Sequence, residues 1–143
     1  MTRFLLGPLA TLDARSALSW MTLRIILAGL IAAHGWARLF ADGVVPFGTW
    51  LEGQGFPFGL AIAASITAFE MAGTVFFAIG RFVFPLSLLY AAVYVVGILL
   101  VHLPSGWFVV GLGRNGAEYS VLLIACLVLV GLQHRTTKRP VEN

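Results

Sequence analysis

The chain has 143 residues, which is enough for one domain and too few for two. Hydrophobic residues make up 59% of it and charged residues only 10%, and the mean hydropathy is +0.95. This balance excludes an ordinary water-soluble protein and predicts an integral membrane protein whose main partner is the lipid bilayer. The net charge is +3, but the basic residues gather near the two ends of the chain, so we expect no nucleic-acid partner.

Four apolar stretches are long enough to cross a membrane. A hydrocarbon core about 30 Å thick needs roughly 20 helical residues. Backbone polar groups in lipid must be paired within the segment, which favours continuous helices. We therefore predict an all-α fold, an integral membrane four-helix bundle that forms a single domain over residues 1–143. The predicted spans are residues 20–40, 57–79, 82–101 and 117–133.

The connections between these spans differ in length and in charge. The turn around Arg81 is short, so the second and third spans should form a close antiparallel hairpin. Two long connections, 42–59 and 102–116, fall on the opposite side, and the first is rich enough in aromatic residues to lie on the membrane interface. The positive-inside rule then predicts that both termini are cytoplasmic. The basic residues on the side of the termini are Arg3, Arg15, Arg81 and those within 135–139.

Ionisable residues inside the spans should have partners, because each costs at least ~2.5–3.5 kcal/mol to insert. At 1.5 Å per residue, Arg24 in the first span and Glu70 in the second both fall in the inner half of the membrane. We expect them to form a structural ion pair that clamps the two helices together. A proton-handling carboxylate at Glu70 is the alternative.

A second polar group is predicted in the outer half. His34 and Arg38 are four residues apart and share one face of the first span. Both lie in the outer half of the first span, close to the depth at which the third span ends at His102 and the fourth begins at Glu118. We expect one ligand-binding pocket there, covered by the glycine-rich connection that precedes the fourth span. The residues predicted to line or cover it are His34, Arg38, His102, Trp107, Asn115 and Glu118.

Structural roles stay open for the same residues. Glu118 could complement the helix dipole in the first turn of the fourth span, and His34 could be satisfied by one interhelical hydrogen bond. The two histidines and Glu118 share no short motif, so we predict no metal site. No nucleophile–base motif identifies catalytic residues, and the single Cys126 excludes an intramolecular disulfide.

Three residue patterns point to one family. The most specific is H-x(3)-G-W-F followed by G-x-G-x-N-G-x-E-Y, over residues 102–119. Weaker patterns are R-x(9)-H-G-x(2)-R-L over 24–39 and E-x(2)-G over 70–73. Together they resemble the DoxX family of small four-helix bacterial membrane proteins. Arg38 stands where that family often has lysine, which keeps the positive charge.

The resemblance implies a multi-pass protein of the bacterial inner membrane, related to the membrane subunit of a thiosulfate:quinone oxidoreductase. It implies a subunit of a membrane redox complex, with a quinone or small-molecule pocket in the outer half of the bundle. The chain has no evident redox centre, so we expect no intrinsic cofactor and a protein partner that carries one. A non-catalytic scaffold or small-molecule carrier is the alternative. Whether the chain is itself catalytic stays open, as do its ligand and its oligomeric state.

Overall fold

The computed structural model describes residues 9–135, with side chains described from residue 14. All regular secondary structure in this part of the chain is helical, which confirms that the fold is all-α. The helices are α1 (Leu9–Phe40), α2 (Val44–Gly53), α3 (Gly59–Ala78), α4 (Val83–Gly97) and α5 (Glu118–Gln133). A π-helical turn, η2 (Ile98–His102), and a 3₁₀ turn, η3 (Leu103–Ser105), extend α4.

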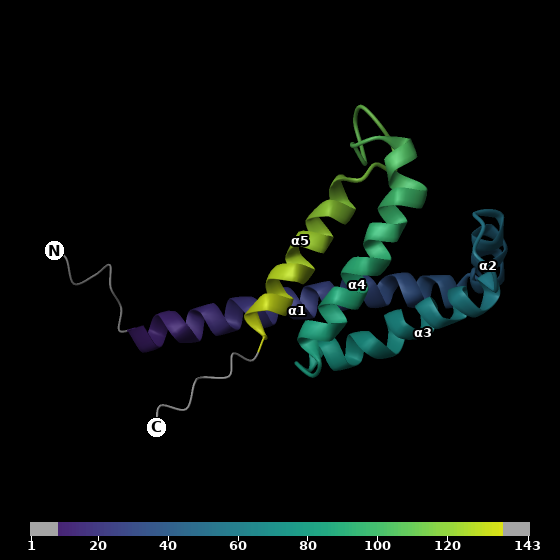
Figure 1. Cartoon of the computed structure of the whole chain (residues 1–143). Helices are drawn as coiled ribbons and strands as arrows, with labels where there is room; N and C mark the ends of the chain where they lie inside the picture. The colour runs from purple at the N-terminus through teal and green to yellow at the C-terminus, as the bar shows by residue number, and fades with distance from the viewer. Residues whose placement is uncertain (1–8, 136–143) are drawn as a thin grey trace, which may run out of the picture.

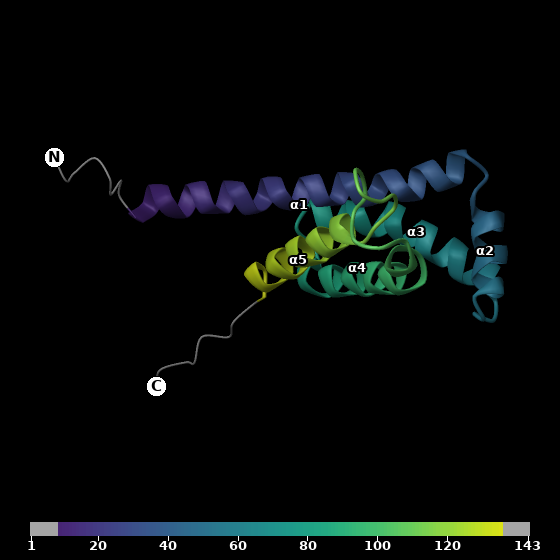
Figure 2. The same ribbon diagram turned by 90° about the horizontal axis from the view of Figure 1, so that it is seen from above.

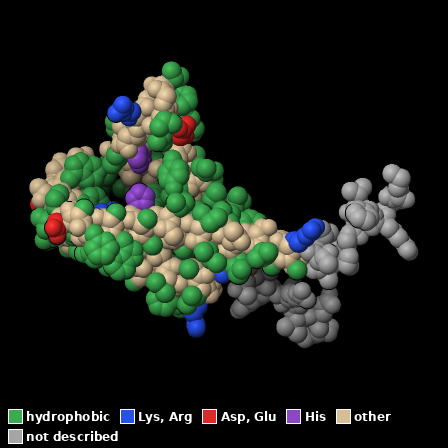
Figure 3. Space-filling model, turned by 180° about the vertical axis from the view of Figure 1, so that it is seen from behind, with side chains coloured by type: hydrophobic (Ala, Val, Ile, Leu, Met, Phe, Trp, Pro, Cys, Tyr) green, Lys and Arg blue, Asp and Glu red, His purple; other side chains and the backbone are tan. Residues whose placement is uncertain are grey.

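Three of these helical segments are long and apolar enough to cross a membrane: Ala14–Phe40, Gly59–Ala78 and Val83–Ser105. Helix α5 is apolar but has 16 residues, so it is about 24 Å long and shorter than a typical hydrocarbon core. Large apolar side chains are exposed on every one of these helices, and they cover much of the face seen in Figure 3. Such a surface is suited to lipid, and the chain is a multi-pass membrane protein.

The four long helices form two antiparallel pairs. Helix α1 packs chiefly on α3, and α4 chiefly on α5. The pairs are steeply inclined to each other, and they meet near the turn that joins α3 to α4 (Figures 1 and 2). They separate toward α2 on one side and toward the 103–117 loop on the other. Helices α3 and α4 are steeply inclined to each other and touch mainly where Tyr90 of α4 packs on Phe69 and Phe77 of α3. They do not lie side by side along their length, so the predicted close antiparallel hairpin is wrong.

The buried core lies where the two pairs meet. Tyr90 and Phe77 are its largest fully buried side chains, and their rings pack edge to face at 6.0 Å. Helices approach closely where glycine removes a side chain. A Cβ at Gly131 of α5 would lie 2.8 Å from the Cβ of Ser87 in α4. A Cβ at Gly35 of α1 would lie 3.0 Å from the Cβ of Glu70 in α3.

Helix α2 occupies part of the connection for which the sequence predicted a long loop. It packs along α3, and Gly48 of α2 meets Gly59 and Leu60 of α3 backbone to backbone. Proline is tolerated in the first turn of a helix, where its missing N–H has no acceptor, and Pro46 lies there. A helix also pairs the backbone N–H and C=O groups of an apolar segment with one another, whereas an irregular loop would need water to hydrogen-bond them.

Candidate functional site

The buried ion pair of the structure joins Arg38 of α1 to Glu70 of α3. Arg38 Nη1 donates to Glu70 Oε2 at 2.7 Å and to Thr67 Oγ1 at 3.0 Å. The side chain of Arg38 is 19% exposed and that of Glu70 5%. Phe47 of α2 covers the guanidinium, with its ring centroid 4.6 Å from Cζ. The pair therefore links α1, α2 and α3, and each polar partner is satisfied.

The predicted pairing of Arg24 with Glu70 is wrong. The prediction assumed that the first and second spans begin and end at the same levels. In the structure Gly35 of α1 lies against Glu70, because the intervening α2 displaces the start of α3 beyond the end of α1. Arg24 is 11 residues before Gly35, about 16 Å along the helix axis, and cannot reach Glu70.

Arg24 instead lies where the two helix pairs meet. Its Nη1 atom is 2.7 Å from Nε2 of His134, at the end of α5. Its guanidinium also lies against the turn after α3, since a Cβ on Gly80 would be 3.2 Å from both terminal nitrogens. Arg24 therefore connects α1 to α5 and to the α3–α4 turn.

The predicted pocket corresponds in part to a cavity of about 210 Å³ between the two helix pairs, called here the loop-side cavity. The histidines visible in Figure 3 lie in the hollow between the two arms of the molecule. Three of the six predicted residues, His34, His102 and Asn115, line the cavity. Its full lining is His34, Tyr94, His102, Val109, Asn115, Gly116, Tyr119 and Ser120.

The geometry of His102 fixes its hydrogen-bonding role. Its Nδ1 atom lies 2.8 Å from the backbone carbonyl oxygen of Asn115. A carbonyl oxygen can only accept, so the Nδ1 atom carries the proton and donates it. In the neutral ring, Nε2 is then left as a hydrogen-bond acceptor. On the opposite side of the cavity, the ring of His34 in α1 packs edge-on against Tyr94 of α4, with ring centroids 6.5 Å apart.

Tyr94 is one of the cavity residues that sequence reasoning missed. Its hydroxyl is fully buried and has no hydrogen-bond partner among the described residues. Buried polar groups nearly always have a partner, so an unpaired hydroxyl beside a cavity is unusual. A signal was present in the sequence, because Tyr94 precedes His102 by eight residues and so shares its helix face.

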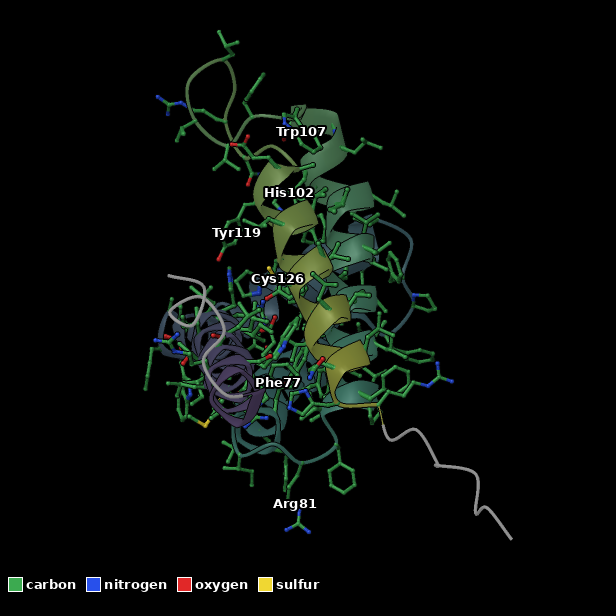
Figure 4. All side chains as sticks on the ribbon, turned by 90° about the vertical axis from the view of Figure 1, so that its left-hand side faces the viewer. Phe77, Arg81, His102, Trp107, Tyr119 and Cys126 are labelled. Atoms are coloured by element: carbon green, nitrogen blue, oxygen red, sulfur yellow. The ribbon has the colours of Figure 1, made fainter. Side chains whose placement is uncertain are left out.

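The other three predicted residues do not line the cavity. Arg38 is held by Glu70. Glu118 accepts a hydrogen bond from the backbone N–H of Val109 at 2.9 Å, and its own N–H donates to the carbonyl of Trp107 at 3.0 Å. Trp107 is 54% exposed and lies beyond His102 at the loop end of the molecule, opposite Arg81 (Figure 4). Glu118 and Trp107 thus shape the loop that covers the cavity.

No group of three or more histidine, cysteine, aspartate or glutamate residues within the described part of the chain could hold a metal ion.

Comparison with known proteins identifies the family. A family model described as DoxX matches residues 19–103, more than half of the chain. The match covers the parts of α1 and α3 that carry Arg24, His34, Arg38 and Glu70, and it ends at the first residue of the 103–117 loop, before α5. Neither the curated proteins nor the solved structures gave a match. The chain belongs to the DoxX family.

Proposed function

We propose that this DoxX-family protein is a subunit of a redox complex in the bacterial inner membrane, and that its loop-side cavity binds a quinone headgroup or a similar small molecule. The histidine and tyrosine side chains in the otherwise largely apolar lining of the cavity carry this proposal. His34 and His102 face the cavity from different helix pairs, and Tyr94, whose buried hydroxyl has no partner among the described residues, also lines it.

The size and chemistry of the cavity suit a ring with oxygen substituents. Its volume, about 210 Å³, is below the ~300–1,000 Å³ typical of sites for drug-sized ligands, which favours a headgroup over a whole lipid-like molecule. The hydroxyl of Tyr94 can donate to a carbonyl oxygen, and Nε2 of neutral His102 can accept from a hydroxyl. The sequence holds a single cysteine and no evident redox centre, so electrons would come from a partner protein.

Binding should depend on the two side chains that offer hydrogen bonds inside the cavity. We expect a short-chain ubiquinone analogue to bind the purified protein, and His102→Ala and Tyr94→Phe each to weaken binding about tenfold, the value of one good hydrogen bond. Equilibrium titration followed by quinone absorbance measures this. Arg114→Gln is the control, because Arg114 lies in the same loop but outside the cavity lining.

A non-catalytic scaffold or carrier is the second candidate. The observation that favours it is the interruption of α4 by the π-helical turn η2, since such turns often mark functional or movable points in a helix. If the quinone analogue binds His102→Ala and Tyr94→Phe as tightly as the unchanged protein, the cavity is not a quinone site and this second function stands.

The proposed topology has four spans with α5 as the last, and both termini in the cytoplasm. The cationic residues Arg15, Arg81 and Arg135 lie toward one end of the molecule, which the positive-inside rule assigns to the cytoplasm. A short span such as α5 is tolerated through local thinning of the bilayer. Reporter fusions at Asn143 and at Gln54 should report opposite sides, with Asn143 inside. A shared side for both would contradict four spans.

A further inference from the structure

A second hollow, of about 480 Å³, opens at the end of the molecule opposite the 103–117 loop, and is called here the turn-side hollow. The α3–α4 turn, the first residues of α4 and the end of α5 form its wall. Arg81, labelled in Figure 4, marks this end of the molecule. The residues of the wall that carry the argument are Gly80, Val83, Phe84, His134 and Arg135.

Two arginines lie at this hollow, and no carboxylate among the described side chains pairs with either of them. The guanidinium of Arg135 lies over the ring of Phe84, 5.6 Å from the ring centroid. The guanidinium of Arg24 lies directly behind the wall, against Gly80 and His134. Within residues 14–135 the single ion pair is Arg38–Glu70, so neither Arg24 nor Arg135 is neutralised by a described carboxylate.

Arg24 also has a donor that is not used. Its Nε atom has no exposed surface and no hydrogen-bond partner among the described residues. An arginine within an apolar membrane-spanning helix is costly unless something compensates its charge. Among the described residues, no acidic side chain pairs with Arg24 to supply compensation for its positive charge.

His134 does not supply it either. Arginine can only donate, so Nε2 of His134 accepts from Arg24, and Nδ1 donates to the carbonyl of Val130 at 2.8 Å. Both ring nitrogens are therefore used, and the imidazole is neutral. Its role is to hold the Arg24 guanidinium next to the hollow, while the positive charge of Arg24 remains.

The start of α4 adds to the same field. The backbone N–H groups of Val83 and Phe84 belong to the first turn of a 15-residue helix and so have no acceptor within it. The helix dipole makes this end positive, and both residues line the hollow. Helix N-termini with free N–H groups are common binding sites for phosphate.

We propose that the turn-side hollow binds a phosphate group, with Arg135 and the first turn of α4 as direct contacts and Arg24 as the charge behind them. The group can come from the headgroup of an anionic lipid or from free phosphate. Basic pockets between membrane helices on the cytoplasmic side are suited to anionic headgroups. The site is separate from the loop-side cavity and does not depend on the function proposed for that cavity.

Native mass spectrometry of the detergent-solubilised full chain tests the proposal. The protein is titrated with phosphatidylglycerol, or with phosphatidylcholine of the same acyl chains, whose choline cation the hollow should repel. We expect phosphatidylglycerol to bind about tenfold more tightly, the effect of one charge-assisted contact. Competition by millimolar inorganic phosphate would assign the site to free phosphate, and its absence would assign it to the lipid headgroup.

Three arginine variants complete the test. Arg24→Gln and Arg135→Gln should each lower phosphatidylglycerol affinity about tenfold. Arg15→Gln removes the same charge from the exposed part of α1 and should leave affinity unchanged. If Arg24→Gln fails to fold because it loses His134, the exposed Arg135 carries the test alone. Equal binding of the two lipids, or an equal loss in Arg15→Gln, would overturn the proposal.

Discussion

Replacing Glu70 with glutamine is expected to destabilise the protein by about 3–5 kcal/mol, the cost of leaving one partner of a buried ion pair alone. Glu70 is 5% exposed and provides the carboxylate that neutralises Arg38. Glutamine has nearly the same size, so the loss would reflect charge and hydrogen bonding rather than packing. Thermal unfolding in a mild detergent, compared with the unchanged protein, measures it.

The double variant separates a pair from two independent residues. Arg38→Gln should also be strongly destabilising, whereas Arg38→Gln/Glu70→Gln should cost clearly less than the sum, because no charge is then buried alone. Glu52→Gln is the matched control, since it removes an exposed carboxylate of α2 and should change stability by less than about 0.5 kcal/mol. Additive losses would show that Arg38 and Glu70 do not stabilise the fold as a pair.

The length and composition of the apolar stretches were enough to predict α1, α3, α4 and α5, but not α2. Each predicted span contains one long helix, because lipid leaves an apolar segment few alternatives to pairing its own backbone. The residues that carry polar chemistry were also identifiable, because an arginine or glutamate inside an apolar span is costly unless it has a polar partner. Arg24, Arg38 and Glu70 all have polar contacts in the structure.

Which polar residues meet was not predictable in the same way. The partner of Glu70 depends on how far α3 is shifted along α1, and this shift depends on α2. The sequence of α2 contains Pro46 and Gly48, which are more typical of a loop. Once the connection is read as a loop, the register of α3 is undefined. The contact of Arg24 with His134 joins residues 110 positions apart and has no local signal.

The loop-side cavity was predicted in position but only partly in composition. Convergence of the helix ends brought His34, His102 and Asn115 to it. Tyr94 and Tyr119 were missed because a tyrosine near or within an apolar span resembles an ordinary interfacial or core residue. The two helix pairs meet where Tyr90 of α4 packs on Phe69, Gly73 and Phe77 of α3. The inclination between the pairs, which opens the cavity, has no signature in hydropathy.

Replacing Gly48 with alanine is the second large expected effect. A Cβ at this position would lie 2.7 Å from Cα of Leu60 and 2.9 Å from its backbone nitrogen. Both are backbone atoms of α3, so neither can turn aside as a flexible side chain would. We expect a loss of about 1–3 kcal/mol, the usual cost of overpacking a close contact. Thermal unfolding measures the loss, and faster amide exchange over Val44–Gly53 shows whether α2 has separated from α3.

Gly53 gives a control within the same helix. A Cβ there would meet no atom within 4 Å, so Gly53→Ala keeps the change in helix propensity and removes the clash. Alanine in place of glycine stabilises a helix by up to about 1 kcal/mol, so this variant should be neutral or slightly more stable. Equal stabilities for Gly48→Ala and Gly53→Ala would contradict the close packing of α2 on α3.

Combining Gly48→Ala with Glu70→Gln shows whether α2 supports the Arg38–Glu70 ion pair. If Gly48→Ala releases α2, Phe47 leaves the guanidinium of Arg38 and water gains access to it. The Arg38–Glu70 hydrogen bond would then be more solvated, so breaking it would matter less. We therefore expect Glu70→Gln to destabilise Gly48→Ala by less than it destabilises the unchanged protein. An equal loss in both backgrounds would mean that α2 covers Arg38 without strengthening its pairing with Glu70.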